Sequence, residues 1–309
     1  MHRFTVLLFS VAGTLLLQPS VKSATPDGKA FPSADAAAQA LVTAAKNADT
    51  AALIEILGPS GNRIVVTGDA VADRNRMRAF AARAAQKLVL EPVKGRQNAR
   101  TLLAGKDAWP LPIPIVEVNG QWYFDTAQGK EEILTRRIGA DELDAIDVCR
   151  GFVEAQHDYG ARNRGTDNLP VYAQKIISSP GEHDGLYWPT SSESDTSPIG
   201  EIVAKAIAQG YTNKHDPYRG YYFKVLTAQG PHVSGGEMSY LENGRMTKGF
   251  ALIAWPSNYG STGIMTFVVD KSGIVYQKDL GGKTAEIAGA YSAYDPDETW
   301  TPVADATRP

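Results

Sequence analysis

The segment of this chain whose side chains are best suited to catalysis spans residues 181–189 and has the sequence GEHDGLYWP. It places His183 between Glu182 and Asp184, with a glycine on each side of the three. A carboxylate beside an imidazole can orient it for general base catalysis. Adjacent residues on an extended loop point in different directions, however, so we assign no catalytic residue. A hydrolase with His183 as base and Glu182 or Asp184 as its partner is the alternative.

Aromatic side chains gather at two places in the sequence. Tyr187 and Trp188 follow the histidine, and Trp255 and Tyr259 belong to the segment WPSNYG. Such rings can stack on a sugar or on an aromatic side chain of a partner protein, and they can equally pack a loop onto a sheet. We predict these four residues as binding residues, with packing as the competing interpretation.

Several kinds of catalytic site have motifs that this sequence lacks. It contains no G-x-S-x-G, H-E-x-x-H, G-x-G-x-x-G or P-loop pattern. His157, His183, His215 and His232 stand apart from one another, so no zinc-type spacing occurs. We therefore predict neither a metal nor a cofactor.

The single cysteine, Cys149, cannot form a disulfide within the chain. Leu143, Ile146 and Val153 lie at helical spacing around it, which puts Cys149 on the apolar stripe of a helix. We interpret Cys149 as a buried core residue rather than a nucleophile or a crosslink to a second copy.

The N-terminus has the layout of a secretory signal peptide. Arg3 precedes an apolar run over residues 4–17, and small residues follow at Val21, Ser23 and Ala24. The run is shorter than the roughly 20 residues that span a bilayer. We predict that residues 1–23 are a signal peptide and that the protein is exported to the periplasm or the extracellular space, with no integral membrane segment after cleavage.

Composition narrows the class of protein further. The chain has 309 residues, of which 43% are hydrophobic and 21% charged, values typical of a globular protein. This length suggests two domains. The net charge of −3 makes the protein mildly acidic, which gives it no overall attraction to a phosphate backbone, so we do not expect nucleic-acid binding.

The first predicted domain, residues 30–138, combines helices with a small curved antiparallel sheet. Asn119-Gly120 between two apolar runs predicts a tight hairpin. Four arginines, Arg74, Arg76, Arg78 and Arg83, are interpreted as the solvated face of a helix. The helices are expected at 34–47, 50–57, 73–87 and 129–138, and the strands at 88–91, 101–103, 113–118 and 121–125.

The second predicted domain, residues 139–309, places a long helix over 141–161 on an antiparallel meander. A shorter helix is expected to carry Tyr172, Ile176 and Ile177, followed by a long loop over 178–200. A further helix is expected at 202–209 and the strands at 221–226, 250–255, 263–269 and 274–278. Helices followed by an antiparallel meander indicate the α+β class.

Four segments carry a family resemblance: WPLPIPIVEVNGQWYFDTAQGKEEILTRRIG, YAQKIISSPGEHDGLYWP, PYRGYYFKVLTAQGP and MTKGFALIAWPSNYGSTGIMTFVVDKSGIVYQKDLG. They resemble the bacterial exported family called domain of unknown function 2950. This resemblance implies export and supplies no catalytic residue. The N-terminal part also resembles nuclear-transport-factor-like domains, and the C-terminal part resembles type IV pilins. Family members often carry an acidic loop after the long helix, where this chain has only Asp167 in residues 163–168.

Two functional hypotheses follow from these observations. The first is a non-enzymatic binding or assembly module of the cell envelope, whose partner is an envelope protein or a glycan. The second is the envelope hydrolase based on His183. A hydrolase needs a concave site where His183 meets a second polar group from elsewhere in the chain.

Overall fold

The computed structural model describes residues 26–163, 168–189, 195–211 and 216–304. The predicted signal peptide, His215 and Asp167 lie outside these residues. Within them, no helix combines the length and the apolar character needed to cross a membrane. The class is α+β, as the element order predicts.

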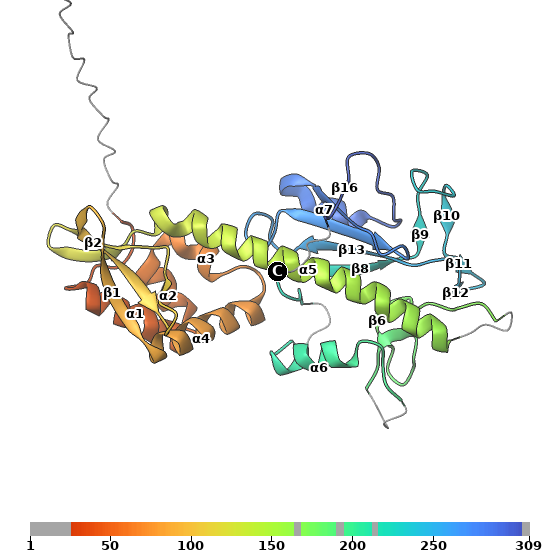
Figure 1. Cartoon of the computed structure of the whole chain (residues 1–309), viewed down its shortest axis with the longest axis horizontal. Helices are drawn as coiled ribbons and strands as arrows, with labels where there is room; N and C mark the ends of the chain where they lie inside the picture. The colour runs from red at the N-terminus through yellow and green to blue at the C-terminus, as the bar shows by residue number, and fades with distance from the viewer. Residues whose placement is uncertain (1–25, 164–167, 190–194, 212–215, 305–309) are drawn as a thin grey trace, which may run out of the picture.

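The N-terminal unit, from α1 to β5, packs helices against a small antiparallel sheet (Figure 1). The strand order is β1-β2-β4-β5, with β3 paired to β2. Its helices are α1 (Ala34–Lys46), α2 (Thr50–Leu57), α3 (Asn62–Val65) and α4 (Ala70–Gln86), with a 3-10 turn η1 (Pro59–Gly61). Its strands are β1 (Leu88–Val93), β2 (Arg96–Ala104), β3 (Trp109–Pro110), β4 (Ile115–Val118) and β5 (Gln121–Phe124).

Side-chain caps set the starts of these helices. Ser33 Oγ accepts a hydrogen bond from the amide of Ala36 at 3.1 Å, which confirms the predicted start of α1. Helix α4 begins at Ala70 rather than at the predicted residue 73. The reason is the buried Asp69, whose carboxylate accepts from the first amides of α4. The β4–β5 hairpin is confirmed, with positive φ at Asn119 and Gly120.

Helix α5 (Thr126–Arg162) connects the two halves of the molecule as one element of 37 residues. Two helices were expected here, ending at 138 and restarting at 141. The predicted domain boundary therefore lies inside a helix. A glycine within a helix costs only about 1 kcal/mol relative to alanine, and Gly139 has good helix formers around it. Packing of α5 at both of its ends offsets that cost.

The C-terminal unit, from β6 to β16, is built on an antiparallel sheet of order β16-β15-β14-β13-β8. Helix α5 packs on β13, β14 and β15, as predicted (Figure 1). Cys149 is fully buried in this interface, which confirms its core position, and burial raises the pKa of its thiol to about 12. The sheet strands are β8 (Tyr221–Leu226), β13 (Ala251–Pro256), β14 (Met265–Asp270), β15 (Val275–Asp279) and β16 (Thr301–Pro302).

The segment after α5 departs from prediction. The shorter helix expected around Tyr172 and Ile176 is wrong: β6 (Lys175–Ile177) pairs in parallel with β7 (Gly185–Tyr187), inside the expected loop. Ile176 and Ile177 are β-branched and fit a strand better than a short helix. The smaller elements are α6 (Gly200–Ala208), β9 (Ala228–Gln229), β10 (Met238–Ser239), β11 (Leu241–Glu242), β12 (Arg245–Met246), η2 (Gly281–Lys283) and α7 (Thr284–Ala290).

Candidate functional site

The loop that carries the predicted histidine constellation is packed by its own side chains. The indole of Trp188 is 7% exposed and belongs to the core under α5. Its Nε1 donates to Asp195 Oδ1 at 2.8 Å. The His183 ring lies flat on the indole, with centroids 4.3 Å apart and planes at 16°. His183 thus occupies the face on which a ligand would stack.

The structure does not pair His183 with the neighbouring carboxylates. Its Nε2 lies 3.6 Å from Asp195 Oδ1, a residue from further along the chain. The Asp184 carboxylate instead accepts from Lys175 Nζ at 2.6 Å and from the Ser179 amide at 2.7 Å. These two hydrogen bonds lower the pKa of Asp184 to about 2. Glu182 is exposed to solvent.

The remaining predicted binding residues are half-buried and lie on separate elements. Tyr187 ends β7, and Trp255 lies on β13 with its ring 5.7 Å from that of Tyr222. Tyr259, in the loop between β13 and β14, donates its hydroxyl to Asp279 at 3.2 Å. None of these three residues lines the cavity described next.

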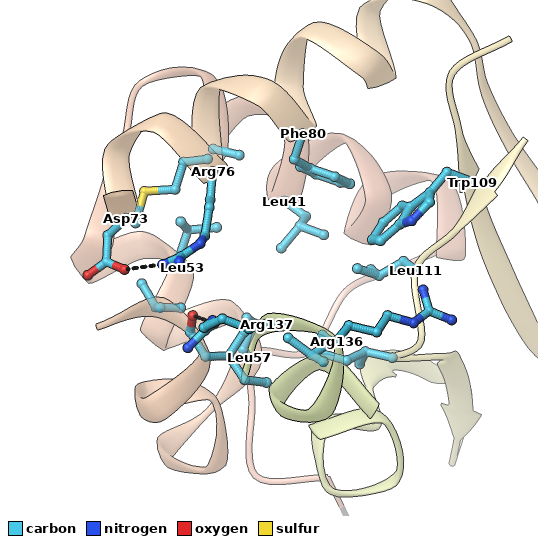
Figure 2. Close-up of a pocket in the computed structure, with 16 residues that line it drawn as sticks. Leu41, Leu53, Leu57, Asp73, Arg76, Phe80, Trp109, Leu111, Arg136 and Arg137 are labelled. Carbon is cyan, nitrogen blue, oxygen red and sulfur yellow. Dashed lines mark hydrogen bonds and ion pairs between the residues drawn. The ribbon is translucent and has the colours of Figure 1, made fainter. Parts of the chain in front are cut away.

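A cavity of about 350 Å³ lies in the N-terminal unit, enclosed by helices α1 to α5 and by the chain around β3 (Figure 2). Most of its lining is aliphatic or aromatic. The lining residues are Leu41, Ala45, Leu53, Leu57, Ile64, Val65, Asp73, Arg76, Met77, Phe80, Trp109, Leu111, Ile113, Ile133, Arg136 and Arg137. Ligand sites of proteins are typically about 300–1,000 Å³ and predominantly apolar, so this cavity has the size and lining of a small-molecule site.

Helical periodicity brings these residues to one place. Arg76 and Phe80 are four residues apart on α4, and Ile133 and Arg137 are four apart on α5, so each pair shares a helix face. The interpretation of the four arginines as a solvated face is therefore wrong for Arg76, which is half-buried and points into the cavity region (Figure 2). The signal that identifies it is its spacing from Phe80.

Arg76 forms two ion pairs that close one end of the cavity, one with Asp141 and one, from Nη1 at 3.5 Å, with Asp73. Arg76 Nη2 donates to both carboxylate oxygens of Asp141 on α5, at 2.7 and 2.8 Å. Burial raises the pKa of Asp141 to about 6, against the opposing effect of Arg76. Asp73 accepts from the backbone amide and the hydroxyl of Thr67, and burial raises its pKa as well.

Arg137 fixes the cavity wall formed by α3. Its Nη1 donates to the carbonyl of Arg63 at 2.9 Å, and its Nη2 donates to the carbonyl of Ile64. Burial lowers the pKa of this guanidinium to about 10, and the positive charge of Arg76 acts in the same direction. Because these donors satisfy backbone carbonyls at the end of a short helix, Arg137 is a structural group of the wall.

The opposite end of the cavity is a partly open rim. Phe80, Trp109 and Ile133 are half-buried there, whereas Leu41 and Ile113 of the floor are buried. The guanidinium carbons of Arg83 and Arg136 each lie 5.9 Å from the centroid of the Trp109 ring. The rim therefore combines an aromatic surface with two cations (Figure 2 shows Arg136 beside Trp109).

Polar contacts also join the cavity wall to the C-terminal unit. Arg63 of α3 donates through Nε to Ser261 Oγ at 3.1 Å and through Nη2 to the carbonyl of Gly260 at 2.5 Å. Asp69, the cap of α4, accepts from the Tyr211 hydroxyl and from the Gly220 amide, both at 2.9 Å. Two of the helices that enclose the cavity are thus tied to loops of the other unit.

The fold and the cavity define an α+β protein in which a long shared helix carries a hollow N-terminal unit and a meander-based C-terminal unit. The chain belongs to the family described as protein of unknown function (DUF2950), whose sequence model matches residues 28–303. This match confirms the resemblance found in the sequence. No curated protein and no solved structure matches the chain. Within the described residues, no group of three or more His, Cys, Asp or Glu side chains is placed to hold a metal ion.

Proposed function

We propose that this protein is an exported, non-enzymatic binding module of the cell envelope, and that its N-terminal unit holds a small, largely apolar ligand. The observation that carries the proposal is the cavity of about 350 Å³ with its aliphatic and aromatic lining. Monomeric interiors are close-packed and leave few voids larger than a water molecule, so an apolar space of this size is a feature that requires an explanation. The signal-like pattern of residues 1–23 supports export.

Binding and assembly then occupy different parts of the molecule. The half-buried aromatics Tyr187, Trp255 and Tyr259 are candidates for contact with an envelope protein or a glycan, because each ring keeps part of its surface in solvent. Trp188 is not among these candidates, because it is buried and His183 stacks on its ring. The contacts of Arg63 with Gly260 and Ser261 connect the cavity wall to the loop that carries Tyr259.

The hydrolase alternative gains no support from the geometry. His183 rests on Trp188, its Nε2 lies 3.6 Å from the carboxylate of Asp195, and Asp184 is held by Lys175 and Ser179. A general base needs its partner and its substrate within hydrogen-bond reach in a concave site. The lining of the cavity includes none of the residues of this loop.

Titration of the mature protein with the neutral apolar dye N-phenyl-1-naphthylamine tests the proposal. We expect a saturable rise in fluorescence at one dye per chain. Ala45→Phe places a ring inside the cavity and should weaken dye binding at least about tenfold. The matched control is Ala85→Phe, which adds the same ring at an exposed position of α4 and should leave dye binding unchanged.

Two results would contradict the proposal. One is a linear, non-saturating response to the dye, which indicates nonspecific adsorption. The other is an equal loss of binding in the Ala45→Phe and Ala85→Phe variants, which would place the dye outside the cavity. Circular dichroism of both variants verifies that the comparison is made between folded proteins.

A further inference from the structure

We propose that the ligand of the cavity is an amphipathic carboxylic acid of medium chain length, with its hydrocarbon chain in the cavity and its carboxylate at the rim on Arg136. This inference rests on the proposed binding function and specifies the class of ligand. It follows from three observations: the sign of the charges in the lining, the hydrogen bonds that each arginine already makes within the protein, and the volume of the cavity.

The charged residues of the lining are predominantly cationic. Besides its apolar residues, the lining contains Arg76, Arg136, Arg137 and a single acid, Asp73. An apolar cavity with this charge favours an anionic ligand over a cationic one. A guanidinium also matches the planar geometry of a carboxylate and can donate two hydrogen bonds to it.

Two of the three arginines are already committed to the protein. Arg76 donates to both oxygens of Asp141, and Arg137 donates to two backbone carbonyls of the α3 wall. A ligand carboxylate could recruit Arg137 only by breaking a partly buried contact, which is costly. Arg76 Nη1 makes no hydrogen bond, but it lies 3.5 Å from Oδ1 of Asp73, and that carboxylate would repel a ligand carboxylate there. These two side chains thus shape the closed end of the cavity.

Arg136 is the cation best placed to meet a ligand. Its side chain is 44% exposed, and its Nε donates to Glu132, itself 54% exposed, at 2.7 Å. Exposed pairs of this kind contribute only about 0.2–1 kcal/mol, so a carboxylate delivered by a bound chain can displace Glu132. Because Arg136 lies beside Trp109 at the rim, a headgroup there leaves the chain free to enter the cavity.

Arg83 adds a second cation to the same location. Its guanidinium carbon is 5.9 Å from the centroid of the Trp109 ring, the same distance as that of Arg136. It pairs with Asp107 at 3.2 Å, and both side chains of that pair are exposed. The Trp109 ring thus has two cations beside it, each held only by a weak surface pair.

The volume sets the length of the chain. An apolar cavity of about 150 Å³ takes a benzene molecule with its six carbons. By that proportion, a cavity of about 350 Å³ holds on the order of fourteen carbons. A saturated acid of about ten carbons stays within that capacity and is therefore the probe we choose. Its amphipathic form matches a cavity that is apolar inside and cationic at the rim.

Calorimetric titration with decanoate, 1-decanol and decylamine at pH 8 tests the inference on the mature protein. The three probes share one chain and differ in headgroup charge. We expect decanoate to bind about tenfold tighter than decanol, and decylamine, as its cation, to bind weaker than decanol. Raising the salt concentration should reduce the advantage of decanoate, because the headgroup contact is exposed.

An arginine variant then identifies the contact. Arg136→Gln should lower decanoate affinity to about that of decanol and leave decanol affinity unchanged. Arg78→Gln removes an exposed arginine of α4 that is absent from the lining, and should change neither. Because both side chains are exposed, both variants should fold, which thermal melting verifies.

The outcomes separate this inference from the proposed function. Equal affinity for decanoate and decanol, or tighter binding of decylamine, overturns the carboxylic acid inference while leaving an apolar binding site in place. An Arg136→Gln variant that retains the full preference for decanoate also overturns it. Failure of all three probes together with failure of the neutral dye removes both proposals, whereas dye binding alone removes only the inference.

Discussion

The Gly181–Pro189 loop and the N-terminal cavity both combine aromatic rings with charged groups, yet they differ in how those groups are used. In the loop, the groups are paired with one another or with neighbouring segments: His183 covers Trp188, and Lys175 of β6 holds Asp184. At the cavity rim, Trp109 and Arg136 border an open apolar space. The short segment with several reactive and aromatic side chains is thus a well-packed loop. The candidate site is instead assembled from five helices and a strand.

The difference is also one of sequence separation. Every residue of the loop constellation lies within a segment of nine, but the cavity combines residues between Leu41 and Arg137. Local proximity makes a constellation easy to see in a sequence, and it gives no information on whether space for a ligand remains. Space is a property of the packing between elements.

The largest effect that tests this comparison is expected from Trp188→Ala. Removing a buried tryptophan leaves a cavity, so the free energy of unfolding should fall by about 3–5 kcal/mol. For a protein of this size, such a loss lowers the melting temperature by roughly 10 °C. Thermal denaturation followed by circular dichroism measures it.

Trp255→Ala is the matched control for that experiment. Trp255 is half-buried, so its truncation should cost less than half as much. The opposite result would be a Trp188→Ala variant with the melting temperature of the wild type and a Trp255→Ala variant with a lower one. The loop would then be a surface feature, and its aromatic residues would again be candidate ligand contacts.

Much of the fold was predictable from local signals. Ser33 and Asp49 mark helix starts, and Asn119-Gly120 marks the hairpin. Ile146, Cys149 and Val153 mark the buried face of α5, whereas Leu143 of the predicted stripe is exposed. Each depends on interactions between residues close in sequence. The α+β class and the order of the meander follow from adding such signals together.

The features that could not be predicted depend on contacts between distant residues. Gly139 suggests a break when read alone, but packing of α5 on both units carries the helix through it. Strand β6 exists because β7 pairs with it, and nothing in the sequence near Ile176 identifies that partner. The cavity is an extreme case, since its rim requires Trp109 and Arg136 to meet across the unit.

A second, intermediate effect should come from filling the cavity. Ala45→Phe puts a ring into apolar space, and cavity-filling substitutions commonly stabilise a protein by about 0.5–2 kcal/mol. We therefore expect this variant to gain about 1 kcal/mol in urea denaturation, while its ligand affinity falls. A loss of about 1–3 kcal/mol, the usual result of overpacking, would mean that the cavity has no room and that the comparison with the loop fails. Ala85→Phe, on the surface of α4, should be neutral.

The smallest expected effect on stability concerns the carboxylate of Asp184 in the loop. Hydrogen bonds from Lys175 and Ser179 lower the pKa of Asp184 from 3.8 to about 2. Because the folded value lies below the unfolded one, the ionised carboxylate stabilises the protein above about pH 4, and this contribution is lost as the pH falls from about 4 to 2. The side chain is 41% exposed, so solvent screening limits the contribution to about 1 kcal/mol or less.

Urea denaturation of an Asp184→Asn variant measures this contribution. At pH 7 the variant should be less stable than the wild type by up to about 1 kcal/mol, and the two should converge as the pH approaches 2. Glu182→Gln changes the exposed neighbour and should be as stable as the wild type at pH 7. A difference that persisted at pH 2 would show that Asp184 acts through its shape rather than its charge. If the Asp184→Asn variant is as stable as the wild type at pH 7, Asp184 has no structural role. It is then again a candidate partner of His183 in catalysis.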